Sequence, residues 1–215
     1  MPLEDMASFF NSRVDSYEEH MMREDNPIYV EVAQLIPKNP GLKLLDLGCG
    51  TGLELDEIFK VNPKVHVTGI DLTENMLQRL RQKHKSRHNQ LNLIKADYLK
   101  YNFGQNIFDI ALSVQTLHHF TREVKIVLYK KIYVCLKQTG FYIESDYFAP
   151  DQAFEDFHFT ENKRLRAEQG ITTGHYHYDI PYTVENQIGM LKKAGFRSVE
   201  TLHRREKGAI LVARK

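Results

Sequence analysis

Carboxylates and glycines stand at the ends of three predicted strands, in a pattern that suits the binding of a nucleoside. The apolar run "LLDLGCGTG" (44–52) ends in a loop with three glycines, and a backbone without side chains lets a ligand approach closely. Asp71 ends the next strand, 19 residues beyond Gly52, where a carboxylate can accept hydrogen bonds from ribose hydroxyls. Asp97 ends a third strand, where it could accept from the exocyclic amine of a base.

The glycine spacing excludes two common phosphate-binding loops. The dinucleotide fingerprint G-x-G-x-x-G/A needs a small residue at the position that Leu53 occupies. Gly-Lys-Ser/Thr is absent from the chain, which excludes a Walker-type loop. The loop therefore suits a nucleoside without pyrophosphate. The structural alternatives are a glycine-rich turn without a ligand, and aspartates that only end strands or cap helices.

Strand and helix patterns alternate after residue 40, which predicts a mostly parallel sheet covered on both faces. A closing hairpin adds one antiparallel strand, so we expect a doubly wound α/β sheet of seven strands. The predicted strands are 42–48, 64–71, 91–97, 108–114, 140–146, 198–204 and 208–214, and the predicted helices are 53–61, 73–84, 122–136 and 183–196.

Two segments fall outside this alternation. Residues 1–40 contain a helical stretch, "MASFFNSRVDSYEEHMM", and residues 147–182 are inserted between the fifth strand and the last helix. Ligands of open α/β sheets bind at the carboxyl ends of the strands, and we expect both segments to fold over that edge. We therefore expect one domain over residues 1–215, with a helical lid at its start and a lid-like insertion.

Composition gives no sign of a nucleic-acid or membrane partner, and the two lid segments suit a small acceptor better than a polymer. The 215 residues carry a net charge of +1, so no overall field attracts nucleic acid or a membrane. No apolar run approaches the roughly 20 residues of a membrane helix, and the N-terminus lacks a signal-peptide pattern. Two cysteines give no disulfide framework. We expect a cytoplasmic protein, monomeric or homodimeric, that binds no nucleic acid.

Three motifs, "LLDLGCGTG", "GIDLT" and "IKADYL", resemble the first three motifs of class I S-adenosylmethionine-dependent methyltransferases. The resemblance extends over nearly the whole chain and implies a Rossmann-like methyltransferase fold with S-adenosylmethionine as cofactor. It implies that Asp46 and the glycine loop hold the methionine part, and that Leu72 and Met76 flank the adenine. The predicted cofactor-binding set is Arg13, Tyr17, Asp46, Gly48, Cys49, Gly50, Gly52, Asp71, Leu72, Met76, Asp97, Tyr98, Ser113 and Gln115.

The N-terminal "FFNSRVDSYEEHM" (9–21) resembles the lid helix of small-molecule methyltransferases. Arg13 and Tyr17 are four residues apart and share one helix face. The carboxylate of a bound amino acid is a natural partner for Arg13. The alternative is an ordinary surface helix with an exposed arginine.

Four residues are candidates for catalysis: Tyr17, His118, His119 and Glu144. The two histidines follow the fourth strand, where they either act as a base or support the cofactor. Glu144 and Asp146 share one face of the fifth strand and could bind a cationic acceptor, unless they form a solvated strand end. The sulfonium donor is already activated, so the protein mainly aligns the acceptor and excludes water.

The insertion contains "GHYHYDIPYT" (174–183), which is rich in aromatic and imidazole side chains. We predict contacts with the acceptor from His175, Tyr176, His177 and Tyr178, with core packing as the alternative. His158 with the i, i+2 pair His175 and His177 is weak evidence for a metal, and no metal site is predicted.

The sequence thus predicts methyl transfer from S-adenosylmethionine to a small molecule. One alternative is an RNA or protein methyltransferase, which the basic run at 79–88 would favour if it formed a binding patch. A solvated helix face explains that run more simply. The other alternative is a protein that binds the cofactor without catalysis.

Overall fold

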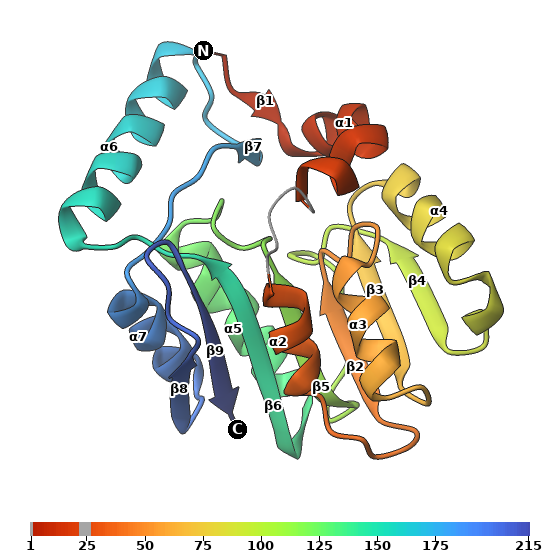
Figure 1. The fold of residues 1–215 in the computed structure, drawn as a ribbon. Coiled ribbons are helices and arrows are strands. Elements are labelled where there is room, and N and C mark those ends of the chain that lie inside the picture. The colour runs from red at the N-terminus through yellow and green to blue at the C-terminus, as the bar shows by residue number, and fades with distance from the viewer. Residues whose placement is uncertain (1, 22–26) are drawn as a thin grey trace.

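A twisted sheet of seven strands forms the centre of the molecule, with its strands in the order β4-β3-β2-β5-β6-β9-β8 (Figure 1). The computed structural model describes residues 2–21 and 27–215. β9 runs opposite to the other six strands, so it pairs antiparallel with both β6 and β8. The strands are β2 (Lys43–Leu47), β3 (His66–Asp71), β4 (Leu91–Lys95), β5 (Phe108–Val114), β6 (Leu136–Tyr147), β8 (Ser198–Leu202) and β9 (Gly208–Arg214).

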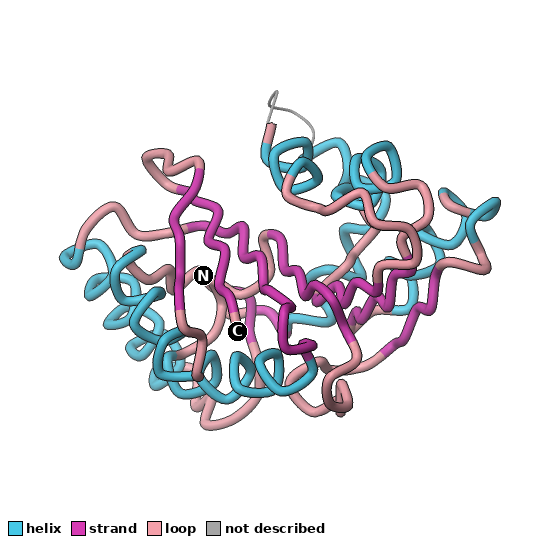
Figure 2. The backbone as a smooth tube through the Cα atoms, turned by 90° about the horizontal axis from the view of Figure 1, so that it is seen from below, coloured by secondary structure: helices cyan, strands magenta, loops and turns pink. Residues whose placement is uncertain are grey.

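Helices cover both faces of the sheet, because successive side chains of each strand point to opposite sides (Figure 2). Leu44 packs with one group of helices and its neighbour Leu45 packs with the other. The first group contains α2 (Ile28–Gln34), α3 (Leu53–Val61) and α4 (Glu74–Lys83), and the second contains α5 (Arg122–Cys135) and α7 (Val184–Ala194). Burial on both faces makes the central strands continuously apolar.

The predicted fold class is confirmed, including the antiparallel strand of the C-terminal hairpin. Two elements of the insertion were not predicted, namely the short strand β7 (Tyr176–His177) and the helix α6 (Gln152–Glu168), which follows β6. Asp151 caps this helix by accepting a hydrogen bond from the Phe154 amide at 2.8 Å, a local signal that the sequence does contain. A short 3-10 helix at Lys85–Arg87 also precedes β4.

The two segments outside the alternation meet in a second, two-stranded sheet. β1 (Glu4–Asp5) pairs antiparallel with β7 (Tyr176–His177), and α1 (Met6–Met21) follows β1 directly. The Met6 amide donates to the His175 carbonyl at 3.1 Å. β1, α1 and β7 lie above the carboxyl edge of the large sheet (Figure 1). Helix α2 of the first segment does not follow the prediction, because its apolar side packs on a face of the sheet. None of the helices within residues 2–21 and 27–215 combines the length and apolar character needed to cross a membrane.

Candidate functional site

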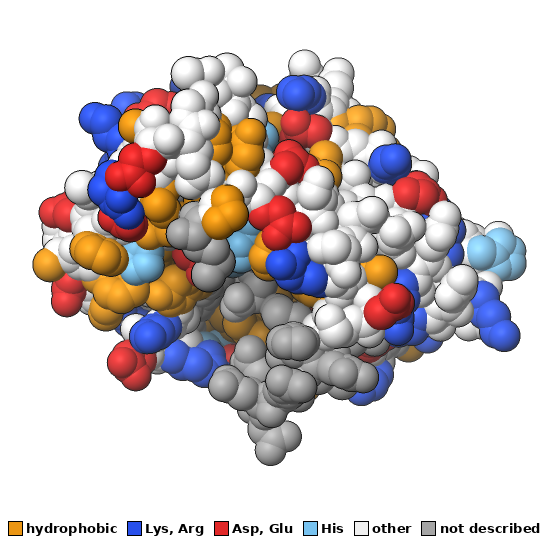
Figure 3. Space-filling model, turned by 90° about the horizontal axis from the view of Figure 1, so that it is seen from above, with side chains coloured by type: hydrophobic (Ala, Val, Ile, Leu, Met, Phe, Trp, Pro, Cys, Tyr) orange, Lys and Arg blue, Asp and Glu red, His pale blue; other side chains and the backbone are white. Residues whose placement is uncertain are grey.

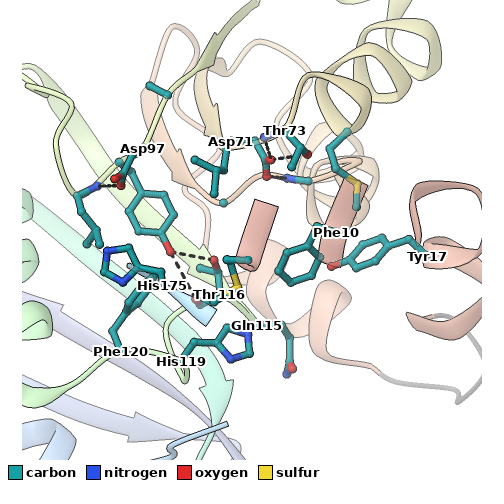
Figure 4. A pocket seen from close by; sticks show the side chains of 18 residues that line it. Phe10, Tyr17, Asp71, Thr73, Asp97, Gln115, Thr116, His119, Phe120 and His175 are labelled. Carbon is teal, nitrogen blue, oxygen red and sulfur yellow. Dashed lines mark hydrogen bonds between the residues drawn. The ribbon is translucent and has the colours of Figure 1, made fainter. Parts of the chain in front are cut away.

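A cavity opens at the carboxyl edge of the sheet, between the strand ends and the two lid segments. In open α/β sheets this edge is where ligands bind. Hydrophobic and histidine side chains gather on this face of the molecule (Figure 3). The cavity is lined by Met6, Phe10, Tyr17, Gly48, Gly50, Asp71, Leu72, Thr73, Met76, Ala96, Asp97, Tyr98, Leu99, Gln115, Thr116, His119, Phe120 and His175 (Figure 4).

Side chains in the glycine loop after β2 would have two different effects, a steric clash at Gly48 and the filling of ligand space at Gly50. Gly48 has a φ of 71°, and a Cβ atom there would lie 2.3 Å from Thr116 Oγ1. Gly50 has a φ of 48°, but the atoms nearest to its Cβ position are 4.0 Å away. Gly48 is therefore needed for packing against the loop after β5, whereas the space beside Gly50 belongs to the cavity.

Asp71 connects this loop to the helix that follows β3. Its Oδ2 accepts from the Gly50 amide at 3.0 Å, and its Oδ1 accepts from the Thr73 amide at 2.8 Å and the Thr73 hydroxyl at 3.0 Å. A carboxylate offers about four lone-pair positions, so about one remains on Oδ2. A ribose hydroxyl can use that position, and a second can bind if the Thr73 hydroxyl turns away.

Asp97 and Tyr98 line the cavity on the side away from Phe10 and Tyr17 (Figure 4). Asp97 Oδ1 accepts from the Leu99 amide at 2.9 Å, which fixes the turn after β4. The Tyr98 hydroxyl lies 3.2 Å from Thr116 Oγ1 and ties this turn to the loop after β5. The two loops are thus held in place by the same protein contacts that shape the cavity.

A second, smaller cavity lies behind the glycine loop and shares Tyr17, Gly48, Gly50 and Gln115 with the large one. It is also lined by Cys49, Gly52 and Glu54. Asp46 is 1% exposed and does not line either cavity, but it lies against Glu54. Burial raises the pKa of Glu54 to about 7. Burial and the neighbouring Glu54 likewise raise the pKa of Asp46.

Aromatic and imidazole side chains form the wall opposite Asp71. Phe10 and Tyr17 come from α1, and His119 comes from the loop after β5 (Figure 4). The ring centroids of Phe10 and Tyr17 are 6.2 Å apart, and those of Phe10 and His119 are 6.5 Å apart. Burial, followed by the charge of His118, lowers the pKa of His119 to about 4. At neutral pH this wall is therefore uncharged.

Comparison with known proteins agrees with this geometry. A family described as a methyltransferase domain matches residues 44–140. A carboxy-S-adenosyl-L-methionine synthase from Nautilia profundicola is 29% identical over 232 residues, which covers 96% of this chain and 94% of the relative. A phosphoethanolamine N-methyltransferase from Triticum aestivum is 31% identical over 170 residues, which covers 79% of this chain and 30% of the relative. The chain belongs to the class I S-adenosylmethionine-dependent methyltransferases.

A solved structure also has the fold of this methyltransferase. The phosphoethanolamine N-methyltransferase 2 of Haemonchus contortus, in complex with S-adenosyl-L-methionine, superposes with a TM-score of 0.74 at 17% identity. The match covers 98% of this chain and 58% of that longer protein, so it supports the fold alone. The predicted cofactor, S-adenosylmethionine, is confirmed by the family to which the chain belongs.

The methyltransferase cavities bring together many residues of the predicted site and leave out others. The large cavity unites Tyr17, Gly48, Gly50, Asp71, Leu72, Met76, Asp97, Tyr98, Gln115, His119 and His175, and the small cavity adds Cys49 and Gly52. Neither cavity is lined by Arg13, Asp46, Ser113, His118, Glu144, Tyr176, His177 or Tyr178.

The placement of Glu144 does not fit the predicted contact with an acceptor. Its side chain is fully buried, and its carboxylate accepts from the hydroxyl of Tyr129 at 2.9 Å and the amide of Gln187 at 2.6 Å. These partners belong to α5 and α7, which cover one face of the sheet. Glu144 therefore holds these helices against the sheet, with Lys125 Nζ 3.9 Å away.

Arg13 and Ser113 also have partners inside the protein. The Arg13 guanidinium lies 3.1 Å from Glu4 and 3.8 Å above the Phe9 ring, so it braces the lid and does not face the cavity. The Ser113 hydroxyl lies 2.5 Å from the buried Tyr142 hydroxyl. In this structure neither side chain is positioned to contact the cofactor.

Only one residue of the predicted acceptor-binding segment lines the cavity, namely His175. The ring of His177 stacks on Phe9 with centroids 3.5 Å apart. Tyr176 lies under the Arg166 guanidinium at 5.4 Å, and Tyr178 faces His158 with ring centroids 6.1 Å apart. Tyr176, His177 and Tyr178 thus pack against other protein side chains, as the alternative interpretation of this segment expects.

We expect the stability of this methyltransferase to fall by about 2 kcal/mol between pH 5 and pH 8 because of Glu54. Its folded pKa of about 7 exceeds the ordinary value of 4.5, so within this window the folded state keeps a proton that the unfolded chain has lost. Urea unfolding at several pH values measures the effect. Glu54→Gln should flatten the profile, whereas the half-buried, Lys60-paired Glu57 on the same helix serves as the matched control, Glu57→Gln. An equal slope in Glu54→Gln and the wild type would contradict the assignment.

Proposed function

We propose that this protein transfers the methyl group of S-adenosylmethionine to a small, uncharged or cationic acceptor in the large cavity. The observation that carries the proposal is the single cavity shared by the glycine loop, the strand-end carboxylates and the two lid segments. A donor and an acceptor held together there react without help from a strong base, because alignment lowers most of the barrier.

The cofactor is proposed to lie across both cavities. The ribose binds Asp71, the adenine lies between Leu72, Met76 and the Asp97 turn, and the methionine part extends along the glycine loop toward Glu54. Gly50 and Tyr17 line both cavities, so the sulfur is expected beside them. Tyr17 and His119 are then the side chains best placed to contact the acceptor.

The acceptor class follows from the charges around the cavity. Among the described lining residues there is no lysine or arginine, while Asp71 and Asp97 are acidic. His119 is neutral at pH 7, because its pKa is about 4. An acceptor with a carboxylate or phosphate would lose its hydration here without gaining a cationic partner. The wall of Phe10, Tyr17 and His119 suits an aromatic or amine acceptor.

The basic run at 79–88 does not support an RNA substrate. Arg79 pairs with Asp15 at 2.9 Å, Arg81 with Glu74 at 2.7 Å and Lys83 with Asp56 at 3.0 Å. Acidic neighbours thus neutralise these positive charges on the surface of α4, away from the acceptor side of the cavity. Nucleic-acid binding usually needs basic side chains that are left for phosphates.

Synthesis of a carboxylated S-adenosylmethionine is the second candidate function. The nearly full-length similarity to carboxy-S-adenosyl-L-methionine synthases favours it. The acidic and uncharged lining disfavours it, because a product with an additional carboxylate needs a cation or several hydrogen-bond donors to hold that group.

One incubation distinguishes the two candidates. The protein is mixed with S-adenosylmethionine and a panel of amines, phenols and carboxylic acids, and the cofactor products are analysed by mass spectrometry. Methyl transfer yields S-adenosylhomocysteine in proportion to a methylated acceptor. The synthase reaction yields instead a cofactor that is heavier by one carboxyl group. Binding of the cofactor without either product would support the non-catalytic alternative.

We expect the lid segments to become protected together when the cofactor binds. β1 and β7 pair with each other, and both segments contribute cavity residues, Met6, Phe10 and Tyr17 from one and His175 from the other. Hydrogen exchange with and without S-adenosylhomocysteine measures this, and residues 4–17 and 175–178 should slow by similar factors. Protection of only one segment, or of neither, would contradict a joint closure.

A further inference from the structure

Two histidines and a carboxylate from distant parts of the chain meet beside the cavity. Asp179 Oδ1 lies 3.5 Å from His118 Nε2 and 3.3 Å from His119 Nδ1, and the three atoms all lie within 4.8 Å of one another. Two atoms that bind the same tetrahedral Zn²⁺ at about 2.0–2.1 Å are about 3.3 Å apart. The two distances to Asp179 therefore match the spacing of ligands around such an ion.

These contacts are less suited to hydrogen bonds. The usual N–H···O distance is about 2.7–3.2 Å, and Asp179 Oδ1 is buried without a hydrogen-bond partner among the described residues. A buried carboxylate oxygen without a partner costs folding free energy. A cation between the three atoms would supply the interaction that this oxygen lacks.

A second carboxylate fixes the orientation of His118. His118 Nδ1 lies 2.5 Å from Oδ1 of Asp146, which is 1% exposed. The other oxygen of Asp146 accepts from the Leu117 amide at 2.9 Å, so the carboxylate cannot rotate freely. Metal-binding histidines commonly donate their second ring nitrogen to a carboxylate in this way, which leaves the first nitrogen free to bind the metal.

Backbone contacts hold Asp179 in position. The Ile180 amide donates to the His118 carbonyl at 2.8 Å, and His158 Nδ1 lies 3.1 Å from the Asp179 carbonyl oxygen. His119 Nδ1 also lies 3.3 Å from the Tyr178 carbonyl oxygen, so ion binding exchanges one long hydrogen bond for a coordinate bond. The backbone therefore holds Asp179 beside both histidines before an ion arrives.

We propose that His118, His119 and Asp179 bind a first-row divalent transition-metal ion, with Zn²⁺ as the probe. Two imidazoles and one carboxylate are a common set for such ions. Three protein ligands leave one tetrahedral position for water. The site does not include the residues proposed to hold the cofactor. It also differs from His158, His175 and His177, the set that the sequence offers as weak evidence for a metal.

Zinc titration of chelator-treated protein by calorimetry tests the proposal without any enzyme assay. The wild type should bind one Zn²⁺ per chain, and Asp179→Asn should weaken this binding by at least about tenfold, since it replaces the only anionic ligand. Zn²⁺ should raise the unfolding temperature of the wild type and not that of Asp179→Asn. Replacing Zn²⁺ with Co²⁺ should give visible absorption bands in the wild type alone.

His88→Ala is the matched control, because His88 is an exposed histidine far along the chain from the three ligands, and it should bind Zn²⁺ like the wild type. If Asp179→Asn does not fold, as judged by circular dichroism, His119→Gln carries the same expectation. Equal Zn²⁺ affinity in the wild type and in a folded ligand variant would overturn the proposal. The same holds if His88→Ala loses binding and the ligand variants do not.

Discussion

Replacing Asp71 with alanine is expected to weaken the binding of S-adenosylhomocysteine about 100-fold. A hydrogen bond from a ribose hydroxyl to the carboxylate contributes roughly 1.5–3 kcal/mol. The same carboxylate holds the Gly50 amide and both the amide and the hydroxyl of Thr73. The variant thus loses a contact with the ligand and also frees the loop that approaches it. Calorimetric titration gives the affinity directly.

Two further variants test whether the loss of affinity is specific to the Asp71 carboxylate. Asp71→Asn retains the size of the side chain and part of its accepting capacity, so it should lose less affinity than Asp71→Ala. Asp109 lies near the first residue of β5, at the sheet edge opposite the cavity, and pairs with Lys137 at 2.7 Å. Asp109→Asn should therefore bind S-adenosylhomocysteine like the wild type. Unchanged affinity in folded Asp71→Ala would remove this residue from the cofactor site.

Gly50→Ala is expected to lower cofactor affinity by a factor of about 100 or more, because its methyl group would occupy the space of the ligand. The Cβ position has no atom nearer than 4.0 Å, so the protein itself tolerates the added carbon. Strain from the positive φ costs about 1–2 kcal/mol of stability. We expect a folded protein that is slightly less stable and nearly unable to bind S-adenosylhomocysteine.

Gly41 offers a matched control for this strain. Its φ of 77° is also positive, no atom lies within 4 Å of its Cβ position, and it is exposed far from both cavities. Gly41→Ala should therefore lose a similar amount of stability while its affinity stays that of the wild type. Thermal unfolding and calorimetry on both variants separate the two effects, and equal affinities would place the cofactor elsewhere.

The parts of the site that the sequence predicts well depend on local features. The helix predicted at 53–61 is the helix observed, because it starts immediately after Gly52, whose φ of 74° breaks the strand geometry. Asp71 is the last residue of β3 and Asp97 follows β4. These two strands are parallel and adjacent, so both carboxylates come to the same edge of the sheet. A periodic pattern and a glycine loop suffice for these conclusions.

Glu144 illustrates where the periodic pattern stops being informative. Alternation correctly assigns Glu144 and Asp146 to one face of β6. However, Tyr129 and Gln187 from α5 and α7 cover Glu144, while Asp146 lies one step closer to the strand end and reaches His118. Both carboxylates are buried, but which partners each one meets depends on the helices and loops that pack over the strand, and no window of sequence around position 144 contains that information.

Asp179 could not be found from the sequence for a related reason. Its neighbours His118 and His119 are about 60 positions away in the chain, and the contact forms only because the insertion returns across the strand ends. The many tyrosines of this segment suggested contacts with the acceptor, but three of the four side chains predicted to make them do not line the cavity. Long-range contacts of this kind need the whole topology before any single residue can be placed.

The pairing of β1 with β7 has a consequence for the order in which the molecule is made. Glu4 and Asp5 leave the ribosome more than 170 residues before their partners His177 and Tyr176. Contacts so far apart in sequence close late, because the intervening chain must first be ordered. The glycine loop and the neighbouring strands can fold before the two lid segments pair above them. We therefore expect a nascent chain to expose an open cofactor site before the lid segments can enclose it.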